Sequence, residues 1–221
     1  MTDFTGMPTD FFPFLQELHN RQDKAWLAAN RARYEASVRL PMRALVVATN
    51  IELSARGVPL FGDPTRSVSR INRDVRFSND KRIYKDHAAA TFTRVPGVMS
   101  PGLLYVHLGV EEAFAGIGFY AVDPEDLAAL RQCIADRPAD WLGIEASLAA
   151  AGHPVGSEEA LKRIPRGFEA LAESPVAGAI RRKGQTCKFD LRKDALDAGL
   201  PSRLAEFAHL AAPMLEFGWR V

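Results

Sequence analysis

Cysteine is scarce in this sequence, and long apolar runs are missing. The 221 residues include two cysteines, Cys133 and Cys187, which form no C-x-x-C pair. So little cysteine excludes a disulfide-stapled scaffold and is typical of a reducing compartment. The longest uncharged stretch, Val95 to Val110, has 16 residues and is interrupted by Pro96, Pro101 and three glycines. Because a membrane-spanning helix needs about 20 consecutive apolar residues, we expect neither a membrane segment nor a membrane partner.

A large charge of one sign is also missing. The 28 lysines and arginines nearly balance 27 acids, for a net charge of +1. Nucleic-acid-binding proteins usually carry a clear basic excess, so the total does not favour that class. Residues Met1 to Gly6 lack the basic and apolar regions of a secretion signal. With 47% hydrophobic and 25% charged residues, the chain is expected to be a soluble, globular, cytoplasmic protein.

Motifs for metals and nucleotides are absent too. The sequence has no G-x-S-x-G elbow and no Walker loop, and Gly116-Ile117-Gly118 lacks the third glycine of a dinucleotide-binding turn. The five histidines show no spacing typical of metal ligands; they are His19, His87, His107, His153 and His209. We therefore expect neither a metal ion nor a cofactor, and the default role of each histidine is packing or surface exposure.

The periodicity of apolar residues predicts an α+β fold. Helical spacing dominates residues 9–57, with a bend or interruption expected around Pro41, and residues 67–121 shift towards the period of two typical of strands. Residues 123–221 are expected to form helices with one strand, at Gln185 to Leu191. This order favours a single domain, residues 1–221, with one antiparallel or mixed sheet and helices packed on one face.

The clearest strand signal lies in residues 103–121. Apolar residues alternate there, namely Leu104, Val106 and Leu108, and we expect them to form the buried face of a hairpin whose tip is at residues 111–112. In that register, His107 on the other face stands opposite Gly116, and Tyr105 stands opposite Gly118. Two polar rings beside two glycines predict a shallow floor for a ligand. The alternative is that the glycines mark a bulge or a close helix crossing.

Charge is strongly polarised along the chain. Residues 66–87 carry a net charge of +4 and residues 162–193 carry +6, so the rest of the chain sums to −9. Arginine forks bind phosphate or carboxylate oxygens in pairs. If the two tracts meet in the fold, they predict an anion site.

We expect this site to be a cleft lined by basic and aromatic side chains. The candidate ligand-binding residues are Arg70, Arg73, Arg76, Lys81, Tyr84, Lys85, Tyr105, His107, Lys162, Arg163 and Arg166. Alternation places Arg73 towards the core, where it needs a carboxylate partner. The candidates for that partner are Asp74, Glu17 and Glu35.

Three alternatives to simple anion binding stay open. The first is an enzyme at the same cleft, with Asp74 or His87 as general base and the arginines stabilising negative charge. In the second, the arginines form a structural lattice of ion pairs between helices and sheet. The third is a nucleic-acid-binding protein that uses both basic tracts, although no aromatic stacking platform stands out.

The first basic tract also resembles the signature of a known family. The signature R-x-x-R-D-x-R-F-x-x-x-K-x-P-Y, of a bacterial family of about 230 residues described as a conserved domain of unknown function, is matched by Arg70, Arg73, Asp74, Arg76, Phe77, Lys81 and Tyr84. The departure is Ile83, where the family has proline. Landmarks before and after the tract match in order, including Trp26 and Pro165-Arg166-Gly167-Phe168. The resemblance implies a full-length match and a fold class, without a reaction.

Overall fold

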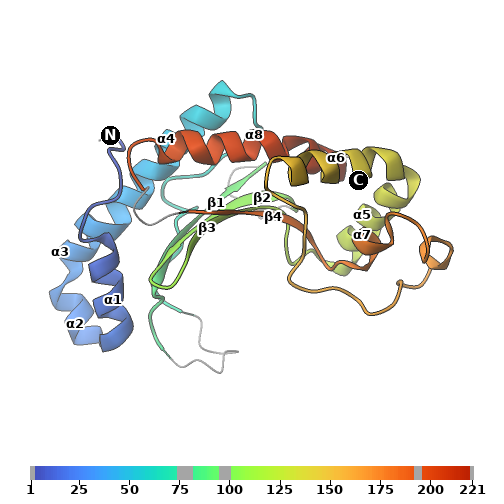
Figure 1. The fold of residues 1–221 in the computed structure, drawn as a ribbon. Coiled ribbons are helices and arrows are strands. Elements are labelled where there is room, and N and C mark those ends of the chain that lie inside the picture. The colour runs from blue at the N-terminus through green and yellow to red at the C-terminus, as the bar shows by residue number, and fades with distance from the viewer. Residues whose placement is uncertain (1–2, 74–81, 95–100, 192–195, 220–221) are drawn as a thin grey trace.

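The sheet has four antiparallel strands in sequence order. In a computed structural model, the structure describes residues 3–73, 82–94, 101–191 and 196–219. The strands are β1 (His87–Thr93), β2 (Leu103–Gly109), β3 (Ala113–Phe119) and β4 (Gln185–Asp190), in the order β1-β2-β3-β4. Helices pack against this sheet (Figure 1), so the predicted α+β class is confirmed.

The N-terminal quarter is helical, as predicted. Its elements are α1 (Phe11–Arg21), α2 (Lys24–Ala29), α3 (Arg31–Tyr34), the π-helical turn η1 (Glu35–Arg39) and α4 (Leu40–Ala55). The interruption expected around Pro41 is present as η1, which ends two residues before this proline and fits the missing N–H of proline. A second break, which the sequence did not predict, falls at Asn30, between α2 and α3.

The C-terminal part supplies the remaining elements. They are α5 (Pro124–Asp136), α6 (Pro138–Ala150), the 3-10 turn η2 (Glu169–Leu171), α7 (Ala177–Arg181) and α8 (Leu200–Gly218). Figure 1 shows α4 and α8 across one face of the sheet and no described helix across the other. It also shows α1 to α3 near one end of the strands, and α5 and α7 near the other end. None of the described helices is long and apolar enough to cross a membrane.

One sheet face is apolar and lies beneath α4 and α8. Leu104, Val106 and Leu108 are fully buried, so the predicted assignment of faces is confirmed. The buried residues of α1, α4, α6 and α8 join the sheet in one hydrophobic cluster. Trp141 of α6 is 0% exposed. The burial of this face leaves the other face of the sheet to carry the polar side chains.

The hairpin register differs from the expected one by two residues. Val106 pairs with Ala115, and the Gly109 N–H donates to the Glu112 carbonyl at 2.8 Å, which makes residues 110–111 the tip. Moving the tip by one residue moves every partner by two and leaves each side chain on its face. His107 therefore stands opposite Phe114 rather than Gly116. The predicted floor is occupied by a ring at that position.

The two glycines of β3 have different roles. Gly118 has a φ of 131°, and a Cβ there would lie 2.1 Å from the Gln185 carbonyl oxygen, so only glycine allows β4 to approach. At Gly116, which stands opposite Tyr105, a Cβ would meet no atom closer than 3.8 Å. A close approach of the backbone, the alternative to a ligand floor, thus explains Gly118. At Gly116, open space remains beside Tyr105.

Candidate functional site

A row of rings crosses three strands at the end of the sheet nearest α1. His87 of β1 stacks on His107 of β2 at a centroid distance of 4.2 Å, and His107 stacks on Phe114 of β3 at 5.0 Å. Lys188 of β4 lies 4.6 Å above the Phe114 ring, and the Tyr105 hydroxyl lies 3.3 Å from His107 Nδ1. We call this set, His87, Tyr105, His107, Phe114 and Lys188, the histidine face.

Both imidazoles of the histidine face are neutral at physiological pH. Burial lowers the pKa of His107 to about 4, and the neighbouring His87 lowers it further. Burial also lowers the pKa of His87, although its hydrogen bond to Asp86 opposes that shift. A neutral imidazole keeps one nitrogen lone pair. Each ring can therefore accept a proton or a hydrogen bond from a ligand.

Asp86 is the anionic centre beside this row. Its carboxylate lies 3.2 Å from His87 Nδ1, 3.0 Å from His19 Nδ1 of α1 and 2.9 Å from Arg82 Nη1. Burial raises the pKa of Asp86, but the hydrogen bonds from His87 and His19 and the charge of Arg82 outweigh it and hold the pKa at about 2. Asp86 is therefore ionised, and it joins α1 to the start of β1.

Three further cations lie close to Asp86. The backbone of residues 71–73 pairs with residues 83–85, since Lys85 N–H donates to the Ile71 carbonyl at 2.8 Å and Arg73 N–H to the Ile83 carbonyl at 3.0 Å. This pairing brings Arg70 and Arg73 near Lys85. Burial, then Arg73, then Arg70 lower the pKa of Lys85. The half-buried Lys85 ammonium has no ion pair or side-chain hydrogen bond with any residue that the structure describes.

The structure brings together part of the predicted site. Arg70, Arg73, Lys85 and His87 are neighbours, and Tyr105 and His107 lie beside them on the same sheet face. Tyr84, predicted to line the cleft, is 7% exposed and belongs to the hydrophobic core. Asp74, Arg76 and Lys81 lie outside the described residues.

The two basic tracts lie at opposite edges of the sheet in the described part of the chain. Residues 61–72 run beside β1, through bridges such as Val68 to Ala90. Lys162, Arg163 and Arg166 are exposed and follow Ala160, which bridges to Arg182 before β4. Three strand spacings separate β1 from β4, a distance of about 14 Å. Lys162, Arg163 and Arg166 therefore do not share one cleft with the described residues of the first tract, whereas Lys188, from the same second tract, belongs to the histidine face.

Sequence reasoning missed five contributors to this site, namely His19, Arg82, Asp86, Phe114 and Lys188. Asp86 and Arg82 lie inside the first basic tract, and the adjacent Asp86-His87 pair is a local signal that could have identified the carboxylate. His19 lies 67 residues before Asp86, so only the folded chain brings them together. Two of the three acids proposed for Arg73 are used elsewhere, since Glu17 pairs with Arg33 at 3.0 Å and Glu35 pairs with Arg31 and Arg39; the third, Asp74, lies outside the described residues.

The site is an open face rather than an enclosed pocket. The cavity beside His87 holds about 10 Å³, which is room for one water molecule. Among the described residues, no group of three histidines, cysteines or acids is arranged to hold a metal ion. A ligand would therefore have to contact the exposed edges of Lys85, His87 and His107.

Comparison with protein families gives one match, which covers residues 10–217 and is described as a conserved hypothetical protein (DUF2461). Comparisons with curated proteins and with solved structures give no match. The matched region spans the N-terminal helices, the whole sheet and nearly all of α8. It also includes every residue of the candidate site. The chain therefore belongs to the DUF2461 family of conserved hypothetical proteins.

Proposed function

We propose that the protein binds a small anion, bearing phosphate or carboxylate, at the cationic end of the histidine face. The observation that carries this proposal is the Lys85 ammonium, which is half-buried and without a counter-ion among the described residues. A buried charge is normally paired, because leaving water costs it several kcal/mol. An anion held between Lys85 and Arg70 would supply that pair.

The neighbouring groups support the same proposal. Arg70 and Arg73 destabilise the charged form of Lys85, which is a poor arrangement for stability and a useful one for attracting an anion. The neutral His87 and His107 add hydrogen-bonding nitrogens without adding charge. Asp86 already contacts Arg82 and two histidines, so its carboxylate does not compete with the anionic ligand for Lys85 and Arg70.

Replacement of Lys85 by methionine tests the proposal. Methionine keeps the apolar stem and removes the charge, so we expect the free energy of unfolding to stay within about 1 kcal/mol or to rise. Affinity for inorganic phosphate or citrate should fall about tenfold, as expected for a lost charged hydrogen bond. Calorimetric titration of both anions measures affinity, and urea unfolding measures stability. Lys24→Met, which removes an exposed cation of α2, is the matched control.

Two results would contradict anion binding at this face. In the first, the parent protein binds neither phosphate nor citrate. In the second, Lys85→Met loses several kcal/mol of stability while anion affinity is unchanged, which would assign Lys85 to a structural lattice.

The Asp86–His87 pair favours a second candidate function, an enzyme with His87 as general base. A carboxylate that accepts from Nδ1 fixes the tautomer and leaves Nε2 as the basic nitrogen. The 3.2 Å separation of His87 Nδ1 and Asp86 Oδ1 fits this role. Nitrogen-15 NMR of the imidazole should report a neutral ring protonated at Nδ1. A ring protonated at Nε2 would remove the proposed base.

A further inference from the structure

A second and larger cavity lies at the opposite end of the sheet. It holds about 350 Å³ and is formed by the β3–α5 connection, the first turns of α5, residues 157–159 and the start of β4. This volume is at the lower end of the range of small-molecule sites. The lining residues are Tyr120, Ala121, Val122, Pro124, Leu127, Arg131, Ser157, Glu158, Glu159, Lys183, Gly184 and Thr186.

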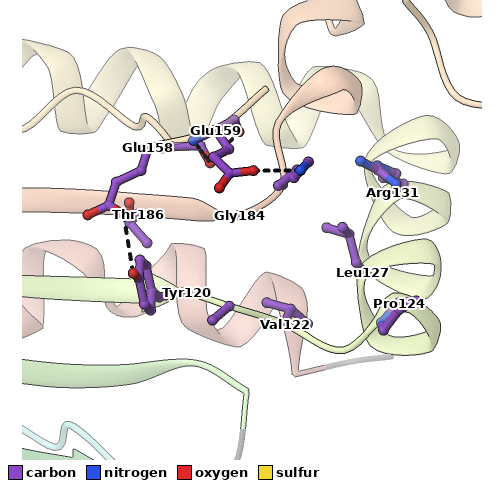
Figure 2. Close-up of a pocket in the computed structure, with 12 residues that line it drawn as sticks. Tyr120, Val122, Pro124, Leu127, Arg131, Glu158, Glu159, Gly184 and Thr186 are labelled. Carbon is purple, nitrogen blue, oxygen red and sulfur yellow. Dashed lines mark hydrogen bonds and ion pairs between the residues drawn. The ribbon is translucent and has the colours of Figure 1, made fainter. Parts of the chain in front are cut away.

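The cavity has an apolar wall and a polar rim. Figure 2 shows Pro124, Leu127 and Arg131 projecting from one helix, α5, with Val122 on the chain segment that leads into it. On the other side, the Tyr120 hydroxyl donates to Glu158 Oε2 at 3.2 Å. Ala121, between Tyr120 and Val122 in the chain, has a φ of 48°, a conformation that residues other than glycine rarely adopt.

Arg131 is the unusual group in this lining. It is 9% exposed, and it donates from Nε to the Ile180 carbonyl at 2.8 Å and from Nη2 to the Arg182 carbonyl at 3.0 Å. These contacts hold the last turn of α7 against α5. They use two of the three guanidinium nitrogens. Nη1 has no hydrogen-bond partner among the residues that the structure describes, although Arg131 lines the cavity.

The other cation around the cavity is already paired, since Lys183 lies 2.5 Å from Glu159. The Glu158 carboxylate at the rim accepts a hydrogen bond from the neutral Tyr120 hydroxyl. Arg131 has no carboxylate partner in the described chain, and burial is the one cause that lowers its pKa. A buried guanidinium that faces a cavity without a counter-ion favours an anionic group on the ligand.

We propose that this cavity binds a small organic carboxylate, whose charged end pairs with Arg131 and whose apolar body packs against Val122, Pro124 and Leu127. A carboxylate matches the guanidinium edge, and the apolar wall gives binding energy that a bare inorganic ion would not gain. This site is separate from the histidine face, because it lies where β3 ends and β4 begins.

Benzoate and benzamide are matched probes for this proposal, since they share one ring and differ in charge. We expect calorimetry or ligand-observed NMR to detect benzoate binding, with benzamide about tenfold weaker because a charged hydrogen bond is lost. Inorganic phosphate should not displace benzoate, because it lacks the apolar body. Benzoate binding should also survive Lys85→Met, which separates this site from the proposed anion site at the histidine face.

Two variants locate the probe. Arg131→Gln keeps an amide donor for the α7 carbonyls and should weaken benzoate about tenfold, whereas Val122→Trp should block the cavity and leave Arg131 in place. Arg137→Gln is the control, because Arg137 follows the same helix, donates to the Phe217 carbonyl and does not line the cavity. If Arg131→Gln does not fold, the probe pair and Val122→Trp still decide. Equal binding of benzoate and benzamide, no binding of benzoate, or unchanged binding by Val122→Trp would overturn the proposal.

Discussion

Replacing Asp86 with asparagine should remove a stabilising charge whose effect depends on pH. The carboxylate is held by His19, Arg82 and His87, and its side chain is 19% exposed. Its pKa in the folded protein is about 2, against an ordinary value of 3.8. A shift of almost two units corresponds to about 2 kcal/mol of stability at neutral pH, at ~1.4 kcal/mol per unit.

The sign of this effect follows from the depressed pKa. Above about pH 4 the carboxylate is ionised in both the folded and the unfolded protein, so its full contribution is present. As the pH falls through the interval between 3.8 and about 2, the unfolded chain takes up the proton first, and the contribution is lost. The difference in unfolding free energy between the parent and Asp86→Asn should therefore fall to about half near pH 3.

Urea unfolding followed by tryptophan fluorescence measures this difference at each pH. Asp190→Asn is the control, because the Asp190 side chain is 84% exposed and, among the described residues, pairs with Lys188 at 3.3 Å. We expect the control to lose about 1 kcal/mol or less at any pH. A constant difference between pH 7 and pH 3 for Asp86→Asn would refute the charge argument. A difference near zero at pH 7 would show that Asp86 does not join α1 to the sheet.

Two further predictions concern backbone space and thiol burial. Gly118→Ala should destabilise the protein by roughly 1–3 kcal/mol from its positive φ alone, and by more through contact with the Gln185 carbonyl. Gly116→Ala should be neutral or stabilising by about 0.5–1 kcal/mol. Equal urea midpoints for the two variants would contradict this prediction. Burial leaves Cys187 2% exposed and raises its pKa to about 12, so a thiol reagent should modify the partly exposed Cys133 in the folded protein and Cys187 only after unfolding. Fast labelling of the folded Cys133→Ser variant, in which Cys187 is the remaining thiol, would contradict this prediction.

Local patterns predicted the elements and faces of this fold well. The alternation of Leu104, Val106 and Leu108 identified the buried side of β2, because an error of two residues in register does not change the face. The exact partners could not be derived, since residues 110–111 and residues 111–112 are both acceptable hairpin tips by sequence. The assignment of buried and exposed faces was enough to predict the fold class, whereas the shape of the polar floor also depends on the register of the hairpin.

Tertiary contacts decided what local rules could not. Asp10 precedes α1 and has the residue type of a helix cap, yet its side chain makes no capping hydrogen bond. It accepts instead from Arg33 at 2.6 Å and from Ser37 at 2.8 Å. The His19–Asp86 contact is of the same kind, because no local pattern links a helix residue to an acid 67 residues later, directly before β1.

These pairings separate the structural and the ligand-binding explanations of the first basic tract. A lattice that ties the helices to the sheet requires acids of the N-terminal helical part to reach the basic residues of the first basic tract. Among the described residues, one charged contact joins α1 to the tract, between His19 and Asp86. Its acid belongs to the tract, where it also pairs with Arg82, and not to the helix. The acids Asp10 and Glu17 are held by Arg33 within the helical part. They are therefore not available to neutralise Lys85. The structural lattice explains the pairing of Arg82 with Asp86. It leaves the charge of Lys85 without a partner among the described residues, and an anionic ligand would supply that partner.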